Sequence, residues 1–478
     1  MRLKGFIGPA YSLRSVNVEC QRCVNLYPEI NEIGTGEAAE IGSLVGTPGL
    51  RLLGTCGSGP IRGIYVASTG GMVIVSGSEV YRVNNGWTFT KLGNLVTNSG
   101  RVGMADNGTQ LMIVDGAAGY IVSLVTATLT QIPSASFPGA DTVGFMDGYF
   151  ICNNPGTGQF FWSGLYDGLS WDALDFVTAE GSPDALVGVM VSQRQVWAMG
   201  ARTVEVWWNS GGDPAFARID GAFIEYGCIA PHTVAKLANS VAWVGAGPNA
   251  NGVVWMSVGY QPKRISNHAI EQAIQSYGDI STATAWVYQE NGHAFYCLNF
   301  PNATTTWVYD VATGQWHERS WLNPSGNFER HRAEVYAYGF GSHVVGDYQN
   351  GNIYALEQTT YTDNGLPKKW FRRSPHTSSE MKRLVYSKFQ LDAQMGVGLD
   401  GSPTVGADPQ VLLRYSDDFG NTWTPAGSRS LGKIGEYANR AIWRRLGSSR
   451  NRVFEVSGTD PVQITLLGAE VDVAQGVS

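Results

Sequence analysis

The residues whose type and spacing most suggest chemistry are Cys20 and Cys23, because thiolates separated by two residues can share a metal ion. A structural zinc site takes four ligands, and the sequence offers no second Cys-x-x-Cys pair or nearby histidine to complete the set. We therefore interpret both residues as free thiols, and we expect no metal and no cofactor.

Histidines and carboxylates form no recognisable catalytic pattern. The sequence lacks a His-Glu-x-x-His helix, a Gly-x-Ser-x-Gly turn and a Gly-x-x-x-x-Gly-Lys phosphate loop. The pairs Asp417 with Asp418 and Asp172 with Asp175 lie in turn-like segments, where Asp is favoured for local hydrogen bonds. We predict no catalytic residue and no enzyme, with a glycosidase as the alternative because its two carboxylates usually come from distant positions. The histidines stand apart: His232, His268, His293, His317, His331, His343 and His376.

The segment from Ser416 to Trp423 fits the Ser-x-Asp-x-Gly-x-Thr-Trp pattern of an Asp-box hairpin. In such a turn the aspartate bonds to turn amides, the glycine takes a positive φ and the tryptophan packs beneath. Sialidases carry this box away from their catalytic site, and here it occurs once. We predict a structural turn built by Ser416, Asp418, Gly420 and Trp423.

Two basic clusters are candidates for a docking face toward an acidic neighbour. The alternative is that they are solvated turns and strand faces. Arginine prevails over lysine in the second cluster, and arginine suits interfaces. The residues that we nominate are Lys368, Lys369, Arg372 and Arg373 in the first cluster, and Arg444 and Arg445 in the second.

Composition and charge limit the partners. The 478 residues carry a net charge of −7, so the basic footprint of a protein that grips nucleic acid is missing. Only 15% of residues are charged, which favours a surface partly covered by neighbours. The 6 cysteines are spread widely, as expected for free thiols in a reducing compartment. We expect neither an export signal nor a membrane span.

Short apolar runs closed by Gly, Asn or Asp fill residues 61–360 and predict strands in groups of four. The groups recur about every 40 to 50 residues, which is the range of propeller blades. Large aromatic residues in several third strands suit radially stacked sheets. We predict an all-β fold with a β-propeller of six to seven four-stranded blades. The groups start near Ile61, Gly100, Asp141, Asp184, Thr233, Thr282 and Glu334.

The remaining segments differ from the repeats. Residues 1–60 are extended and rich in turns, and they predict an N-terminal arm that closes the propeller or reaches a neighbour. Residues 361–382 predict a basic linker, and the alternating pattern of residues 383–478 predicts a small antiparallel β-sandwich. A single helix is expected over residues 266–277.

Landmarks in a shared order make the chain resemble the packaged-DNA stabilisation proteins that form the tail hub of short-tailed bacteriophages. The resemblance spans nearly the whole chain. Its landmarks are 22–29 (RCVNLYPE), 46–50 (GTPGL), 226–230 (YGCIA), 242–245 (AWVG), 253–256 (VVWM), 264–271 (RISNHAIE), 416–420 (SDDFG), 442–447 (IWRRLG) and 461–466 (PVQITL).

The resemblance implies a structural protein of the virion tail, made in the host cytoplasm. It implies a ring of copies, commonly six, below the portal and its adaptor. The ring would help to retain packaged DNA, which passes through without specific binding, and would offer sites for a needle or plug and for tail fibres or tailspikes. A sialidase-like glycosidase and a glycan-binding tail protein are the alternatives.

Overall fold

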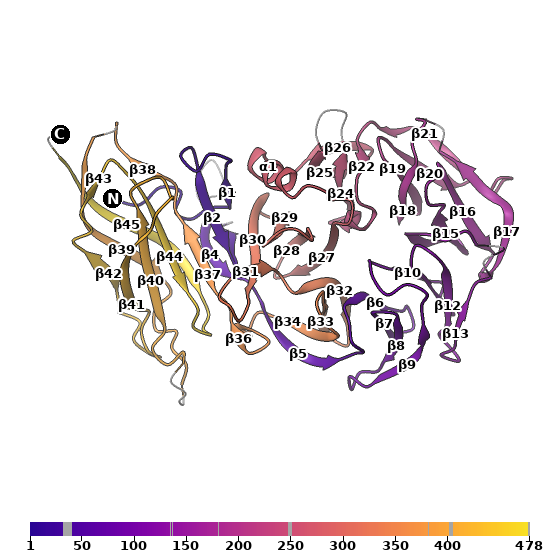
Figure 1. Cartoon of the computed structure of the whole chain (residues 1–478), viewed down its shortest axis with the longest axis horizontal. Helices are drawn as coiled ribbons and strands as arrows, with labels where there is room; N and C mark the ends of the chain where they lie inside the picture. Colours follow the sequence, from indigo (N-terminus) through magenta and orange to yellow (C-terminus); the bar gives the residue numbers. More distant parts are fainter. Residues whose placement is uncertain are drawn as a thin grey trace.

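The structure is a computed structural model that describes residues 1–31, 41–133, 135, 137–179, 181–246, 251–380, 382–400 and 405–476. It is all-β, with a ring of antiparallel sheets beside a β-sandwich along the long axis of the molecule (Figure 1). The predicted fold class is therefore confirmed.

Within the described residues, seven sheets surround one axis and form the blades of a propeller (Figure 1). Most blades start within a few residues of the predicted positions, and the fifth starts earlier, at Gly227. The strands of blades 1 to 4 are β6 (Ile61–Val66), β7 (Met72–Ser76), β8 (Glu79–Val83) and β9 (Phe89–Asn94); β10 (Gly103–Asp106), β11 (Gln110–Val114), β12 (Gly119–Ser123) and β13 (Leu129–Gln131); β14 (Val143–Met146), β15 (Tyr149–Asn153), β16 (Gln159–Gly164) and β17 (Asp167–Thr178); β18 (Leu186–Ser192), β19 (Gln195–Gly200), β20 (Val204–Asn209) and β21 (Phe216–Ile224).

Blades 5 to 7 depart more from the four-strand pattern, and a short helical turn, η1 (Pro231–Thr233), lies in blade 5. Their strands are β22 (Gly227–Cys228), β23 (Ala235–Leu237), β24 (Ser240–Ala246), β25 (Asn251–Val258) and β26 (Gln261–Arg264); β27 (Thr284–Glu290), β28 (His293–Asn299), β29 (Thr306–Asp310), β30 (Gln315–Leu322) and β31 (Phe328–Arg330); β32 (Ala333–Gly339), β33 (Ser342–Asp347), β34 (Asn352–Glu357) and, from the N-terminal segment, β5 (Gly49–Thr55), flanked by β35 (Thr362–Asp363) and β36 (Leu366–Pro367).

Tight turns and apolar layers explain why this sequence forms blades. The hairpin between β14 and β15 turns on Asp147 and Gly148, which have φ of 51° and 96°, as a primed turn requires. Neighbouring blades bury apolar side chains between them. Between blades 3 and 4, for example, the ring of Phe160 lies 5.4 Å from Trp207 and 6.0 Å from Phe216.

The N-terminal segment closes the propeller, because β5 pairs antiparallel with β34 as the outer strand of blade 7. Leu50 of β5 is fully buried, and Arg51 pairs with Glu357 at 2.6 Å. A Cβ at Gly49 would lie 2.2 Å from the carbonyl oxygen of Thr360, so only glycine fits where β5 begins.

The sandwich also takes strands from the N-terminal segment, in addition to the strand that closes the propeller. One sheet contains β1 (Tyr11–Ser12), β2 (Cys20–Val24), β37 (Trp370–Arg373), β38 (Thr377–Ser378), β40 (Gln410–Ser416), β41 (Thr424–Ser430) and β44 (Asn451–Gly458). The other contains β3 (Leu26–Ile30), β4 (Ile41–Gly46), β39 (Leu384–Ala393), β42 (Ala441–Arg444), β43 (Ser448–Ser449) and β45 (Thr465–Gln475). Residues 361–382, which we expected to be a linker, form β35 to β38 instead.

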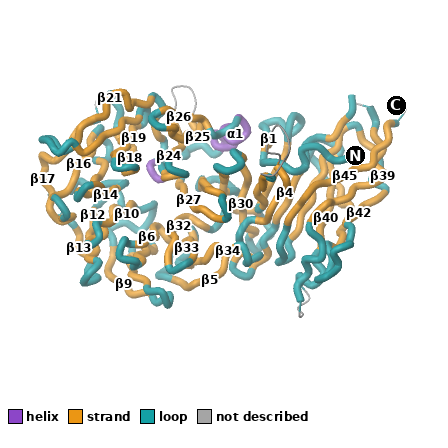
Figure 2. The backbone as a smooth tube through the Cα atoms, turned by 180° about the vertical axis from the view of Figure 1, so that it is seen from behind, coloured by secondary structure: helices purple, strands orange, loops and turns teal. Residues whose placement is uncertain are grey.

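One sheet runs from the propeller into the sandwich. Strand β2 pairs in parallel with β30 of blade 6 and antiparallel with β37. Arg22 of β2 also pairs with Glu318 of β30 at 2.5 Å. The two parts are thus joined by main-chain pairing, and the backbone trace shows them side by side from the opposite view as well (Figure 2).

The expected helix is α1 (His268–Ser276), whose N-terminus is capped by the side chain of Asn267 accepting from Ile270 N. Its buried residues Ile270 and Ile274 pack beside β25. Among the described residues no helix is long and apolar enough to span a membrane.

Candidate functional site

The Asp-box residues form the turn that joins β40 and β41. The Asp418 carboxylate accepts from Thr422 N at 2.8 Å and from Ser416 Oγ at 2.7 Å, and Gly420 has a φ of 95°. These hydrogen bonds, with Thr422 first, lower the pKa of Asp418 to about 2. Trp423 Nε1 donates to Gly420 O. The hydrogen bonds of Asp418 and Trp423 are internal to the turn, so they hold the hairpin.

The nominated basic residues separate into buried and exposed sets. Lys368 and Arg372 are buried, so they cannot contribute to a docking face. Lys369 is half-buried, with its Nζ 5.5 Å from the centre of the Phe328 ring. Arg444 and Arg445 are exposed at the far edge of the sandwich.

Arg373 is also only half-buried and belongs to an internal network. It pairs with the buried Glu455 at 2.9 Å, and Arg414 pairs with the other oxygen of the same carboxylate at 2.5 Å. Both guanidinium groups lie over the ring of Trp423, at 4.6 and 4.7 Å from its centre. Arg373 therefore ties the Asp-box tryptophan to β44 and is not free to dock.

Arg372 fastens the N-terminal segment to the sandwich. Its guanidinium donates to the carbonyl oxygens of Phe6 at 2.6 Å, Gly5 at 2.8 Å and Pro9 at 2.8 Å, and to Gln21 Oε1 at 2.6 Å. Five donors in a fixed fork suit such a set of acceptors.

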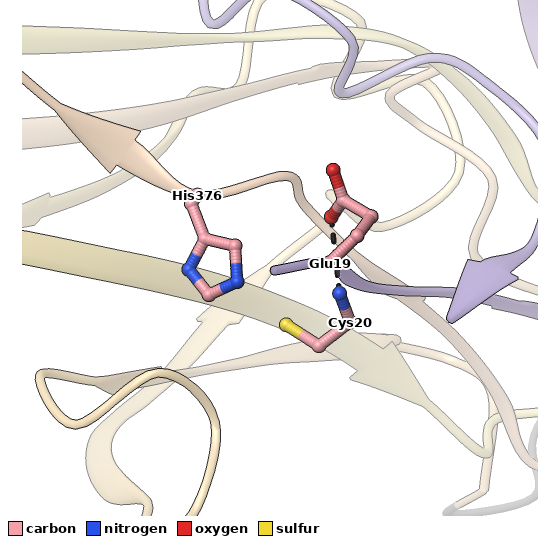
Figure 3. Close-up of side chains that lie close together, drawn as sticks. All are labelled: Glu19, Cys20 and His376. Atoms are coloured by element: carbon pink, nitrogen blue, oxygen red, sulfur yellow. Dashed lines mark hydrogen bonds between the residues drawn. The ribbon is translucent and has the colours of Figure 1, made fainter. Parts of the chain in front are cut away.

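The one place in the described residues where three potential metal ligands meet is formed by Glu19, Cys20 and His376 (Figure 3). Burial raises the pKa of the Cys20 thiol to about 11. Both ring nitrogens of His376 are already engaged, with Val16 O and the Asn451 side chain at 2.9 Å each. Glu19 Oε1 accepts from the Cys20 amide. These occupied groups do not fit a metal site.

Side chains from several blades converge near the propeller axis, a feature that sequence reasoning did not find. Arg101, which precedes β10, donates to Glu334 O at 2.7 Å. The Glu334 carboxylate accepts from Thr284 at 2.8 Å and from Arg330 at 2.6 Å. Burial and the charge of Arg101 lower the pKa of His232 to about 3, so this histidine is neutral.

This axial cluster contains arginines and a carboxylate, the residue types that a sialidase-like site would use. Both oxygens of Glu334 are engaged, however, since one accepts from Thr284 and the other from Arg330. Of the carboxylate pairs noted in the sequence, Asp417 is bound by Arg452 at 2.6 Å, whereas Asp172 is exposed and Asp175 partly exposed on blade 3. The glycosidase alternative gains no support from these contacts.

A second group of buried charged residues lies where blades 6 and 7 meet the sandwich. Asp363 is buried with neither carboxylate oxygen hydrogen-bonded to a described residue, and burial raises its pKa to about 6. Lys368 bonds to Thr47 O, and burial lowers its pKa to about 8. Asp363 and Lys368 are close in the sequence, but Lys368 is bound by the carbonyl oxygen of the distant Thr47, and no local pattern predicts that contact.

Comparisons with known families decide the identity. The model of a family described as "Bacteriophage P22 Gp10, beta-propeller" matches residues 18–361. A second, described as "Bacteriophage P22 Gp10, beta-sandwich", matches residues 369–474. The chain belongs to the bacteriophage P22 Gp10 family. It is accordingly a structural protein of the phage tail, and the resemblance noted in the sequence is confirmed.

Other comparisons add little to the P22 Gp10 assignment. No curated protein matches the sequence. One matching solved structure is the "Crystal Structure of the N-terminal Domain of Nup159", with 10% identity, a TM-score of 0.43, and coverage of 73% of this chain and 100% of that chain. This likeness carries no argument about function.

Proposed function

We propose that this P22 Gp10 family member forms a ring in the phage tail, below the portal and its adaptor. The ring helps to retain packaged DNA and provides attachment for a needle or plug and for tail fibres or tailspikes. The observation that carries the proposal is the ordered match of both the propeller and the sandwich to this one family. No cofactor takes part.

The DNA path lies between copies of the chain, not through the axis of one propeller. Arg101, which precedes blade 2, hydrogen-bonds to Glu334 of blade 7, so side chains reach across the region around that axis. A net charge of −7 suits a wall past which DNA slides, since each neutralised phosphate would add affinity through counterion release. The surface of the ring is therefore expected to contact DNA without gripping it.

The proposal is tested with phage that lack this chain, complemented from a plasmid. We expect particles assembled without the chain to lose their DNA and to lack the outer tail parts, as measured by encapsidated DNA content and negative-stain microscopy. Plasmid-borne wild-type chain should restore both. Full DNA content and complete tails in the absence of the chain would refute the proposal.

A further inference from the structure

The outer strand of blade 3, β17, is an unusually exposed edge strand. It pairs with β16 through Phe176↔Phe161 and Trp171↔Ser163. More residues therefore lie between Trp171 and Phe176 on β17 than between Phe161 and Ser163 on β16. The excess residues bulge from the sheet, where Asp172 Oδ1 accepts from Leu174 N at 2.9 Å. The bulge presents Leu174, which is 82% exposed, at the rim of the propeller.

Further exposed apolar and acidic side chains lie on β17 itself and on β20 and the loop after it in the neighbouring blade. Leu169 and Phe176 of β17 and Trp208 of β20 are exposed large apolar side chains, with Trp208 47% exposed. Asp172 is exposed and Asp175 partly exposed on the bulge, and Asp213 follows β20. We call the set of Leu169, Asp172, Leu174, Asp175, Phe176, Trp208 and Asp213 the acidic rim.

The acidic rim has no cationic partner among the residues that the structure describes. None of its three aspartates forms an ion pair with a described residue. Partial burial, and then repulsion from Asp172 and Asp213, raise the pKa of Asp175. A basic surface placed against the rim would relieve this repulsion while covering Leu174.

The opposite end of the molecule carries unpaired arginines. Arg429 of β41, Arg440 before β42, Arg444 at the end of β42 and Arg445 are all exposed, and none pairs with a described carboxylate. We call these four residues the arginine edge. Arg444 also faces Lys388 across the strand pair, and Lys388 is itself paired with Asp472 at 3.2 Å. The neighbouring loop exposes Ile434 and Tyr437, the latter by 74%.

We propose that the acidic rim of one copy docks on the arginine edge of a second copy. Strand β17 and strand β42 lie at opposite ends of the long axis in both views (Figures 1 and 2). A contact between two unlike surfaces of one chain repeats head to tail, and it forms a ring when the rotation between successive copies closes. Both surfaces combine exposed apolar side chains with charge of opposite sign, which favours and orients such a contact. The inference rests on the proposed ring and names the surfaces that build it.

Charge reversal tests this contact in the complemented phage. The rim variant is Asp172→Arg with Asp175→Arg, and the edge variant is Arg444→Asp with Arg445→Asp. Each variant expressed alone places like charges across every contact between copies. We therefore expect incorporation of the variant chain into purified particles to fall about tenfold or more. Asp279→Arg and Arg82→Asp, at exposed sites away from both surfaces, serve as controls and should incorporate normally.

Coexpression gives the decisive readout. The reversed rim then faces the reversed edge, and the native rim faces the native edge, so the two variants alternate and incorporation should recover. One chain carrying all four substitutions should recover too. Normal incorporation of both single-surface variants would overturn the inference. A rim defect that coexpression does not rescue would also overturn it, and would indicate that another tail protein covers the rim.

Cross-linking supplies an independent test of proximity. The native cysteines are all buried, so introduced surface thiols react without background. Leu174→Cys with Arg445→Cys should give covalent multimers in particles on mild oxidation, whereas Val125→Cys with Arg445→Cys, equally exposed on blade 2, should not. Absence of multimers from the first pair would contradict the contact. Absence of even the wild-type chain from virions would instead refute the proposed function.

Discussion

At the scale of single residues, buried cations connect segments that are far apart in the chain. Arg372 is fully buried, and its guanidinium satisfies main-chain carbonyls of the first ten residues. Removing such a group leaves several buried acceptors unpaired. The resulting loss in the free energy of unfolding is larger than the net contribution of the hydrogen bonds themselves. This arginine therefore holds the N-terminal segment in the sandwich.

Arg372→Met should destabilise the sandwich by about 3 kcal/mol or more, because the apolar side chain fills part of the space but donates no hydrogen bond. Chemical denaturation followed by tryptophan fluorescence measures the change, and limited proteolysis should release the N-terminal segment. The exposed Arg444→Met should change the unfolding midpoint little. Equal midpoints for the two variants would contradict the role of Arg372.

The contacts of His293 indicate a pH-dependent interaction between β3 of the N-terminal segment and β28 of blade 6. Its ring bonds to Asp310 at 2.8 Å and to Glu29 of β3 at 3.1 Å, and these groups, Asp310 first, raise the pKa of His293 to about 8. A raised pKa means that the charged form stabilises the fold. The contribution is full below the unfolded value near 6.5 and disappears as pH rises through 8.

The stability difference between wild type and His293→Gln should accordingly shrink by about 1–2 kcal/mol between pH 6 and pH 9. Denaturant midpoints measured across this range provide the test, with His268→Gln, on the exposed side of α1, as the control. A difference that stays constant with pH would show that the His293 charge does not stabilise the fold.

At the scale of elements, closure of the propeller depends on β5. Leu50 of this strand is fully buried against blade 7, whereas Leu52 of the same strand is 43% exposed. Leu50→Ala should cost about 2–5 kcal/mol, and Leu52→Ala should cost far less. The test is the thermal unfolding temperature of the two variants, which lose the same side chain at a buried and at an exposed position of β5. Similar losses for both would contradict a specific role of the buried face of β5.

Strand spacing predicted the blades well because each blade is built from neighbouring residues joined by short turns. Local alternation cannot predict pairings between segments hundreds of residues apart. The segment 1–60, expected as an arm that closes the propeller or reaches a neighbour, contributes strands to both sandwich sheets as well as the closing strand of blade 7, with residues 32–40 outside the described residues. Lys368 and Arg372 appear in the sequence as a solvated basic run, because burial of their charges depends on the carbonyls of Thr47, Gly5 and Phe6.

At the scale of the whole molecule, the continuous sheet from blade 6 into the sandwich makes the chain a single elongated unit. Strong coupling between its two parts follows from the pairing of β2 with both β30 and β37. Such a unit holds the acidic rim and the arginine edge at a fixed separation, as a closed ring requires. In the proposed ring, the path of the DNA would lie between copies of the chain and not through an individual propeller.

The most direct test of this account is an electron cryomicroscopy reconstruction of the purified virion. We predict several copies of the propeller and sandwich around the DNA path below the portal, with blade 3 of each copy against the sandwich of the next. A reconstruction in which the chain lies away from the DNA path, or in which particles lacking it keep the same tail density, would contradict the account.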